Sequence, residues 1–175
     1  MSPPPLPRIR IIATGGTIAG AAGAVTDTTG YRSGALGIEA LLASVPALAE
    51  VARVDAEQPF SLDSKDLSPA HWLELARLVQ RRLDDPGVDG VVLTHGTDTL
   101  EETAYFLHLV LSTTKPVVLT AAMRPASALS ADGPMNLFQA VNVAARPEAG
   151  GCGVLAVAGD RIWGARTLVK RHTQA

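Results

Sequence analysis

Two short clusters of hydroxyl, glycine and acidic residues are the part of this sequence best suited to chemistry. They are residues 14–17 (TGGT) and residues 94–99 (THGTDT). In the first cluster, the two glycines allow a tight turn and leave the Thr17 hydroxyl unshielded for attack on a carbonyl carbon. A threonine hydroxyl is a weak nucleophile and needs a neighbouring base. The candidates for that base are Tyr31, Lys170 and Asp98.

The second cluster carries groups that suit the binding of an amino acid. Gly96 leaves the backbone open to close approach, Thr97 supplies a hydroxyl, and Asp98 supplies a carboxylate at a predicted helix N-terminus. That position favours the ionised carboxylate, which suits a substrate ammonium group. Ser64 offers a hydroxyl and nearby backbone N–H groups to a substrate carboxylate.

Each of these residues also has an ordinary structural interpretation. Residues 14–17 are compatible with a plain tight turn, and an acid before a helix is commonly its cap, which applies to Asp98 and Asp132. Ser64 alone suits a loop, and Lys170 alone suits a solvated surface. His95 in an interior turn indicates structural hydrogen bonds rather than a base. The remaining histidines have no cysteine or histidine partner at ligand spacing, so no metal site is predicted.

The elements that must position these clusters follow from the hydrophobic pattern. Short apolar runs alternate with stretches of helical period, which predicts an α/β fold with a doubly wound, mostly parallel sheet and helices on both faces. Because ligands bind outside the carboxyl ends of such strands, the polar residues after each run are expected to converge on one edge. The predicted strands are residues 9–13, 91–93, 117–120 and 154–158.

Three helices are predicted between these strands. Ser68 and Pro69 read as the cap and first position of one that continues to Leu83. A second carries apolar residues at 100, 104, 107 and 111. A third opens at Gly133 and ends before Pro147. Residues 19–34 are rich in glycine and small residues without apolar period, which predicts a mobile loop or a loose hairpin.

Composition excludes several classes of function. Over 175 residues, 15 Lys and Arg oppose 17 Asp and Glu, for a formal net charge of −2. This balance offers no electrostatic footprint for nucleic acid or a membrane surface. No stretch approaches the roughly 18 to 20 apolar residues of a membrane span, and the N-terminus lacks a secretory signal, so a cytoplasmic protein is predicted. The single cysteine, Cys152, is expected to be small, buried and reduced.

The length suits one domain with a sizeable core. Proline-rich residues 1–7 are expected to form a disordered tail ahead of an α/β domain over residues 8–175.

Two longer segments resemble the signature motifs of the bacterial-type L-asparaginase/glutaminase family. They are residues 11–20 (IIATGGTIAG) and residues 90–100 (GVVLTHGTDTL), and two such motifs in this order are highly specific. Residues 101–107 (EETAYFL) and 122–134 are also similar to the family, so the resemblance covers nearly the whole chain from position 10 to position 172. It implies the N-terminal α/β domain of an asparaginase, without a cofactor.

The resemblance implies catalytic roles for particular positions. Thr17 matches the family's nucleophilic threonine, and Tyr31 matches the tyrosine that closes over it. Thr97, Asp98 and Lys170 match a second triad across the substrate, and either threonine has been credited with attack. The implied reaction is attack on the side-chain amide of L-asparagine, formation of a β-acyl-enzyme, loss of ammonia, and hydrolysis to L-aspartate.

The resemblance also implies how the substrate is held. Ser64 matches the serine that binds the α-carboxylate, and Asp98 matches the acid that binds the α-amino group. The backbones of Gly16 and Gly96, with that of Thr97, lie where an oxyanion needs donors. Lys65 is a departure, because secreted members often have glutamine there, and this leaves the choice between asparagine and glutamine open.

The larger departure from the family is length. Family members continue into a second, smaller α/β domain that completes each site across a homodimer or homotetramer, and this domain is expected to be absent here. The chain is therefore expected to be a truncated asparaginase whose activity in isolation is doubtful. Two alternatives stay open: a subunit that supplies ammonia to an amidotransferase, and a non-catalytic domain that binds small amino acids. A nucleotide-binding domain is disfavoured, since the glycine spacing is not GxGxxG and the phosphate-loop lysine is missing.

Overall fold

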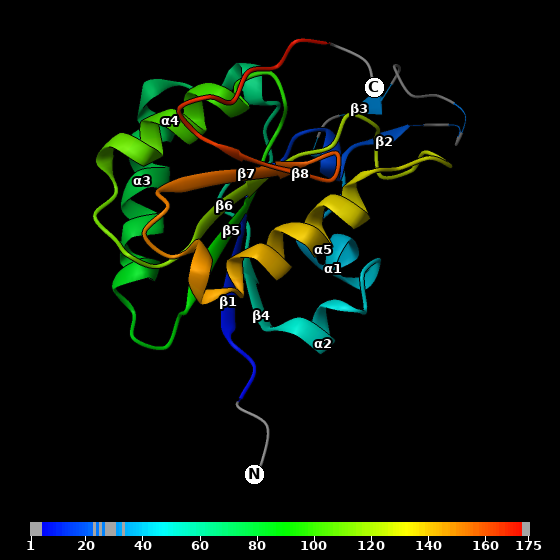
Figure 1. The fold of residues 1–175 in the computed structure, drawn as a ribbon. Coiled ribbons are helices and arrows are strands. Elements are labelled where there is room, and N and C mark those ends of the chain that lie inside the picture. The colour runs from blue at the N-terminus through cyan, green and yellow to red at the C-terminus, as the bar shows by residue number, and fades with distance from the viewer. Residues whose placement is uncertain (1–4, 23, 25, 27–30, 33, 173–175) are drawn as a thin grey trace.

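The architecture is a central sheet between two layers of helices (Figure 1). The computed structural model describes residues 5–22, 24, 26, 31, 32 and 34–172. Within them, a six-stranded sheet has the order β4-β1-β5-β6-β7-β8. Its strands are β1 (Arg8–Ala13), β4 (Arg53–Glu57), β5 (Gly90–Thr94), β6 (Val117–Thr120), β7 (Val154–Ala158) and β8 (Arg161–Gly164). Neighbouring strands pair in parallel, except that β8 is antiparallel to β7.

The two helical layers bury separate apolar cores, which confirms the predicted doubly wound α/β fold. Helices α1 (Ile38–Ala43), α2 (Leu48–Val51) and α5 (Gly133–Ala144) cover one face of the sheet, and α3 (Pro69–Asp84) and α4 (Leu100–Val110) cover the other. Successive strand residues point to opposite faces. In β1, Ile11 therefore packs in the first core and Ile12 in the second, and both are fully buried.

The start of α3 forms as the sequence predicts. The Ser68 hydroxyl oxygen accepts a hydrogen bond from the His71 N–H at 3.4 Å, and the Ser68 N–H donates to His71 Nδ1 at 3.1 Å. Pro69 occupies the first helical position, where its missing N–H leaves no intrahelical bond unmade. This end of α3 faces the carboxyl edge of the sheet and fixes Trp72 one turn into the helix.

The strand order places the reversal of winding beside β1. Because β1 pairs with β4 on one side and with β5 on the other, the connections leave the ends of β1 and β5 in opposite directions. In open parallel sheets, ligands bind at this point, outside the carboxyl ends of the strands. The two polar clusters of the sequence follow β1 and β5.

Several elements were not predicted from the sequence. Strand β4 is polar and partly exposed at the sheet edge, so it carries no apolar run, and the short α1, α2 and edge strand β8 carry little periodic signal. Between positions 19 and 34, β2 (Ala21–Ala22) pairs antiparallel with β3 (Tyr31–Arg32), as in the hairpin alternative. Three-residue 3-10 helices span Thr17–Ala19, Ser64–Asp66 and Pro147–Ala149.

The expectation that Cys152 is buried was wrong. The residue is exposed, and its thiol donates to the Glu148 carbonyl oxygen at 3.4 Å. It lies in a turn before β7 in which Gly151 and Gly153 both have positive φ, and this turn directs the side chain to solvent.

The N-terminal segment and the helices bear on two further predictions. Residues 1–4 of the predicted tail lie outside the described part of the chain. Pro5, Leu6 and Pro7 carry no secondary structure, and the Pro7 carbonyl oxygen accepts from the Arg53 N–H at 2.8 Å. Among the described residues, no helix has the length and apolar character needed to cross a membrane.

Candidate active site

The loops that follow β1 and β5 lie in direct backbone contact. The Thr14 N–H and hydroxyl both donate to the Thr94 carbonyl oxygen, at 3.1 and 2.9 Å. Gly16 has φ +80°, and a Cβ at this position would lie 2.4 Å from the Gly96 Cα. No side chain fits there, so only glycine lets the residue after Gly16, Thr17, approach the second loop so closely. The sequence prediction that these two clusters share one edge is confirmed.

A third loop, residues 58–66, closes against the first two. The Gly16 N–H donates to the Leu62 carbonyl oxygen at 2.9 Å, and the Leu62 N–H donates to the Thr14 carbonyl oxygen at 3.0 Å. These bonds carry the chain onward to Ser64, which is buried in the 3-10 helix Ser64–Asp66. Ser64 is thereby brought from a distant part of the sequence to the end of β5.

Ser64 is locked to the second cluster through both its hydroxyl and its carbonyl group. The Asp98 N–H donates to Ser64 Oγ at 3.2 Å, and the Thr99 hydroxyl donates to the Ser64 carbonyl oxygen at 2.9 Å. A Cβ on Gly96 would lie 2.5 Å from Ser64 Oγ, so this approach also requires glycine. Ser64 is 2% exposed, and its position beside Asp98 is fixed by the fold.

Thr17 begins the 3-10 helix immediately after the Gly16 contact. Its side chain is buried, with the residue 6% exposed, and the neighbouring Ile18 is completely buried in the core. The Gly34 N–H donates to the Gly16 carbonyl oxygen at 3.0 Å, so the segment after the hairpin returns to the same place. Tyr31 belongs to β3 in that hairpin, but its side chain lies outside the described part of the structure.

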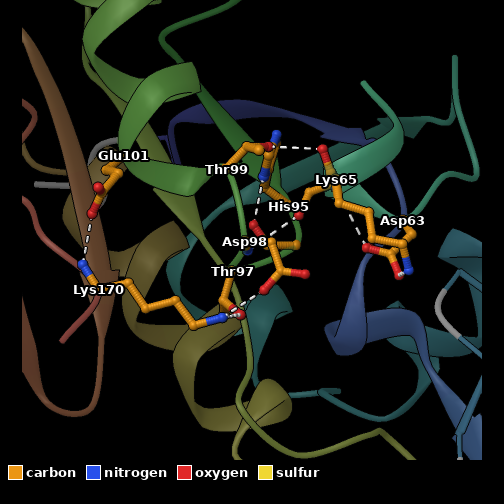
Figure 2. Close-up of polar contacts among 10 residues, drawn as sticks. Asp63, Lys65, His95, Thr97, Asp98, Thr99, Glu101 and Lys170 are labelled. Atoms are coloured by element: carbon orange, nitrogen blue, oxygen red, sulfur yellow. Dashed lines mark hydrogen bonds and ion pairs between the residues drawn. The ribbon is translucent and has the colours of Figure 1, made fainter. Parts of the chain in front are cut away.

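Thr97, Asp98 and Lys170 form a hydrogen-bonded group (Figure 2). Lys170 Nζ donates to Thr97 Oγ1 at 2.8 Å and to Asp98 Oδ1 at 2.6 Å. The Lys170 backbone N–H donates to Glu101 Oε2 at 2.7 Å, which attaches the C-terminal segment to the first turn of α4. Lys170 is separated from Thr97 by 73 positions, and the fold brings the two side chains together.

Lys65 turns toward Asp63 rather than toward the triad. Its Nζ lies 2.9 Å from Asp63 Oδ2, and the hydrogen bond and charge of Asp63 raise the pKa of the Lys65 ammonium. The side chain is 64% exposed, so it lies at the rim of the site (Figure 2). The structure therefore places Lys65 next to the site but directs its charge elsewhere.

His95 is a structural residue, as its position in the turn predicts. It is completely buried, its Nδ1 lies 2.7 Å from the Gly96 carbonyl oxygen, and its Nε2 lies 3.0 Å from the Thr103 hydroxyl. Burial lowers the pKa of the His95 imidazole to about 4, and the bond to Gly96 offsets only part of that effect. At neutral pH the ring is uncharged.

Asp132 holds a loop instead of capping a helix with its side chain. It stands at the N-cap position of α5, but its carboxylate accepts from the backbone N–H groups of Met123 and Arg124 at 3.0 and 2.9 Å. Its Oδ2 also accepts from Asn136 Nδ2 at 3.1 Å. The expected side-chain cap was wrong, because the loop after β6 folds back over the start of α5 and presents its N–H groups to the carboxylate.

Sequence reasoning missed three residues that support the site. Glu101, Thr99 and Asp63 each hold a predicted site residue through a hydrogen bond or ion pair. Thr99 is the last residue of the second cluster and Glu101 follows it at the start of a predicted helix, and sequence alone could have pointed to both through that position. Asp63 carried no comparable signal, because an acid beside a lysine in a loop is common.

The arrangement suits a small zwitterion with a reactive carbonyl group. Asp98 provides a carboxylate that is 50% exposed, and Ser64 provides a buried hydroxyl. A cavity of about 470 Å³ adjoins Thr97 and Lys170. The described residues contain no group of three or more metal-ligating side chains. The site can thus offer an acceptor for a cation, donors for an anion, and threonine hydroxyls at both loops.

Comparison with known proteins gives a consistent result. The family model described as "Asparaginase, N-terminal" matches residues 8–175. L-asparaginase 2 of Bacillus subtilis (strain 168) is 51% identical over 168 residues, covering 96% of this chain and 45% of that protein. Glutaminase-asparaginase of Pseudomonas fluorescens biotype A is 46% identical over 165 residues, covering 94% of this chain and 46% of that protein.

A solved structure matches the fold over the same span. The probable cytoplasmic L-asparaginase from Campylobacter jejuni superposes with a TM-score of 0.94 at 47% sequence identity, covering 97% of this chain and 51% of that one. The chain therefore spans about half the length of the curated relatives it matches.

Proposed function

This chain belongs to the asparaginase family, and on that premise we propose that it forms the nucleophile-bearing part of an enzyme that hydrolyses L-asparagine to L-aspartate and ammonia. The observation that carries the proposal is the contact between Gly16 and Gly96, which joins the Thr17 loop to the Thr97–Asp98–Lys170 group. One loop supplies a threonine for attack, and the other supplies binding groups and a lysine.

The substrate is held by its charged end. The Asp98 carboxylate accepts hydrogen bonds from the α-ammonium group of asparagine, and these charge-assisted bonds are strong. Ser64 Oγ already accepts from the Asp98 N–H, and its own proton has no acceptor among the described residues, so it is available to the α-carboxylate. The side-chain amide then extends toward the Thr17 loop.

The reaction proceeds through an ester on Thr17. The Thr17 Oγ forms a bond to the side-chain amide carbon as its proton passes to a base, for which we propose Tyr31. The C–N bond then breaks, the nitrogen gains a proton and leaves as ammonia, and water hydrolyses the ester to release aspartate. The Thr97 N–H stabilises the oxyanion that forms at each step. The Gly16 N–H, also expected as a donor from the sequence, already donates to the Leu62 carbonyl oxygen.

Lys170 serves the second threonine in this scheme. Its Nζ lies 2.8 Å from Thr97 Oγ1, so it can exchange a proton directly with that hydroxyl. We propose that Thr97 and Lys170 act on the water that cleaves the ester. Lys65 stays at the rim, paired with Asp63, and we expect its replacement by alanine to change KM only slightly.

We further propose a cytoplasmic homodimer or homotetramer for the whole protein. The location is supported by the printed name of the Campylobacter jejuni protein, and the assembly is supported by the family resemblance. Nucleic acid is not proposed as a partner, since the net charge is −2.

Ammonia release by the protein expressed from its natural reading frame tests this function. We expect asparagine to be hydrolysed, and glutamine is assayed in parallel. The Thr17→Ala variant should lose at least about 1,000-fold in kcat, since it removes the nucleophile. It should still bind aspartate in calorimetry within a few-fold of the wild type. Thr114→Ala, at an exposed threonine before β6, is the matched control and should keep full activity.

The alternatives give different results in the same assay. A wild-type protein that binds aspartate but releases no ammonia would be a binding domain, and the proposed hydrolysis would be wrong. Full activity in Thr17→Ala, with loss in Thr97→Ala, would assign the attack to the second threonine instead.

A further inference from the structure

A chain of hydrogen bonds connects two helices on one face of the sheet to the backbone of the second cluster. Trp72 Nε1 on α3 donates to Thr103 Oγ1 on α4 at 2.9 Å. Thr103 Oγ1 lies 3.0 Å from His95 Nε2, and His95 Nδ1 lies 2.7 Å from the Gly96 carbonyl oxygen. Thr103 and His95 are both 0% exposed, so water does not compete for these bonds.

The two ends of the chain fix the direction of every bond in it. An indole N–H can only donate, and a carbonyl oxygen can only accept. His95 Nδ1 therefore carries the proton that it donates to Gly96. In the neutral ring Nε2 is then an acceptor, and it takes the hydroxyl proton of Thr103, whose oxygen accepts from Trp72. A single tautomer satisfies all the groups.

The bond to Gly96 also orients the peptide that precedes Thr97. In a trans peptide, the carbonyl oxygen and the following N–H point in opposite directions. The Gly96 carbonyl points toward the His95 ring, on the side of α3 and α4. The Thr97 N–H therefore points away from that ring, and no acceptor for it exists among the described residues.

The hydrogen bond to His95 removes the last rotational freedom of the Gly96–Thr97 peptide. A residue without a side chain moves more easily between backbone conformations than any other. Gly96 is held by its close contacts with Ser64 and Gly16, and its carbonyl bond to His95 removes the rotation of the peptide plane that these contacts permit. The buried ring stays neutral at physiological pH, because burial lowers the pKa of His95 to about 4.

We propose that Trp72, Thr103 and His95 are positioning residues that orient the Thr97 N–H as a donor to the oxyanion formed during amide hydrolysis. This inference rests on the proposed function and adds to it the source of one donor's orientation. None of the three side chains touches the substrate. Their effect reaches the reaction through the Gly96–Thr97 peptide, so it is expected to appear in kcat rather than in KM.

Variants at Thr103 test the inference in the protein expressed from its natural reading frame. Thr103→Val keeps the shape of the side chain and removes the hydroxyl, and Thr103→Ser keeps the hydroxyl. We expect Thr103→Val to lower kcat about tenfold with KM within twofold, less than the roughly 100- to 1,000-fold loss of a whole oxyanion donor. Thr103→Ser should restore most of the activity. Thr113→Val, at an exposed threonine, is the matched control.

Trp72→Phe provides a second variant that does not empty a buried position, since Trp72 is only partly buried. It removes the first donor of the chain and should lower kcat about two- to threefold, because the bonds of a chain strengthen one another modestly. Nitrogen NMR of histidine-labelled protein gives an independent signature. The His95 Nδ1–H tautomer is expected in all three proteins, because the Gly96 carbonyl oxygen can only accept. The Nε2 resonance is expected to shift in Thr103→Val, which removes the hydroxyl proton that Nε2 accepts, and to stay near its wild-type position in Thr103→Ser.

Each outcome decides one of the two proposals. If the wild type hydrolyses asparagine and a folded Thr103→Val keeps its kcat, the inference is overturned while the proposed function stands. If KM rises and kcat does not fall, the chain acts on binding and the inference is also overturned. A wild type that releases no ammonia removes the proposed function, and the inference with it.

Discussion

The carboxyl ends and the amino ends of the strands form two opposite edges of this sheet, here called the carboxyl edge and the amino edge. Both carry lysines and glycines, but their polar side chains contact different partners. Every buried polar side chain of the described residues lies on the carboxyl side, where the strands end and the helices begin: Thr14, Thr17, Ser64, Thr94, His95, Thr103, Thr120 and Asn136. At the amino edge, Lys115 donates to the carbonyl oxygens of Leu83 and Asp85 at 2.6 and 2.7 Å. At the carboxyl edge, Lys170 donates instead to a threonine hydroxyl and a carboxylate.

The difference shows which observation identifies a site. The amino edge has a cavity of about 630 Å³, larger than the one of about 470 Å³ beside Lys170, yet prolines and exposed arginines line it. Burying a polar group costs free energy unless each of its bonds is satisfied. A concentration of such groups at one edge therefore indicates function better than cavity volume does.

Replacing Lys170 at the carboxyl edge and Lys115 at the amino edge should give the largest difference between the two edges, and that difference is in kcat. Lys170→Met removes the group that exchanges a proton with Thr97, and we expect kcat to fall at least about 100-fold. Its stability should change by less than about 1 kcal/mol, since the ion pair with Asp98 is partly exposed. Lys115→Met should do the reverse, with unchanged kcat and a loss of about 1–3 kcal/mol. Ammonia release and urea unfolding measure the two effects.

A Lys170→Met variant with kcat within threefold of the wild type would show that Lys170 has no role in the reaction. The contact with Thr97 would then be a structural link between the C-terminal segment and α4.

Two glycines with similar positive φ angles allow the cost of backbone strain to be measured separately from the cost of crowding. Gly16 has φ +80° and its added Cβ would meet the Gly96 backbone, whereas Gly151 at the amino edge has φ +73° and no atom within 4 Å of its Cβ position. Both alanine variants should lose about 1–2 kcal/mol to the left-handed conformation. Gly16→Ala should lose a further 1–3 kcal/mol, roughly, because the loops must separate. Unfolding free energies from urea titrations measure the difference, and equal losses would show that the contact is easily relieved.

The same contrast explains how much of the molecule could be predicted from its sequence. Strands β1, β5, β6 and β7 are buried on both faces, so each is a continuous apolar run that can be predicted from the sequence. Strand β4 is at an edge and reads RVDAE, and its pairing with β1 depends on backbone bonds that composition does not encode. Edge strands and short helices are therefore where prediction from pattern failed.

Within the site, residues next to the two motifs were predicted and their supports were not. Thr17, Thr97 and Asp98 lie in the motifs themselves, while Lys170 and Ser64 were candidates from their residue chemistry and took their specific roles from the family resemblance. The Trp72–Thr103–His95 chain depends on how α3 and α4 pack over β5, which is tertiary information. The burial of Cys152 was predicted wrongly for a similar reason, since an apolar run beside it does not fix the direction of a glycine turn.

Lowering the pH should destabilise the folded protein through the buried His95 at the carboxyl edge. Burial lowers its pKa in the folded protein to about 4 from the ordinary value of 6.5. Between these pH values the unfolded chain binds a proton at His95 that the folded protein does not. The contribution of the neutral His95 to the free energy of unfolding is therefore fully present above pH 6.5 and is lost as the pH drops toward 4. The loss is at most about 3–4 kcal/mol. Unfolding free energies from pH 4.5 to 7 should show a steeper slope for the wild type than for His95→Gln, and parallel curves would contradict a buried neutral ring.

The smallest expected effect compares two neighbouring acids in the first turn of α4. Glu101 accepts from the Lys170 backbone N–H at 2.7 Å, whereas Glu102 is exposed. Both lie in the same turn, so both interact similarly with the helix dipole, and only Glu101 holds the segment that carries Lys170. Glu101→Ala should lower kcat about fivefold, close to the ~1 kcal/mol of one such hydrogen bond, and Glu102→Ala should leave it unchanged. Equal kcat values in the two variants would mean that the contacts of Lys170 with Thr97 and Asp98 alone determine where its ammonium group lies.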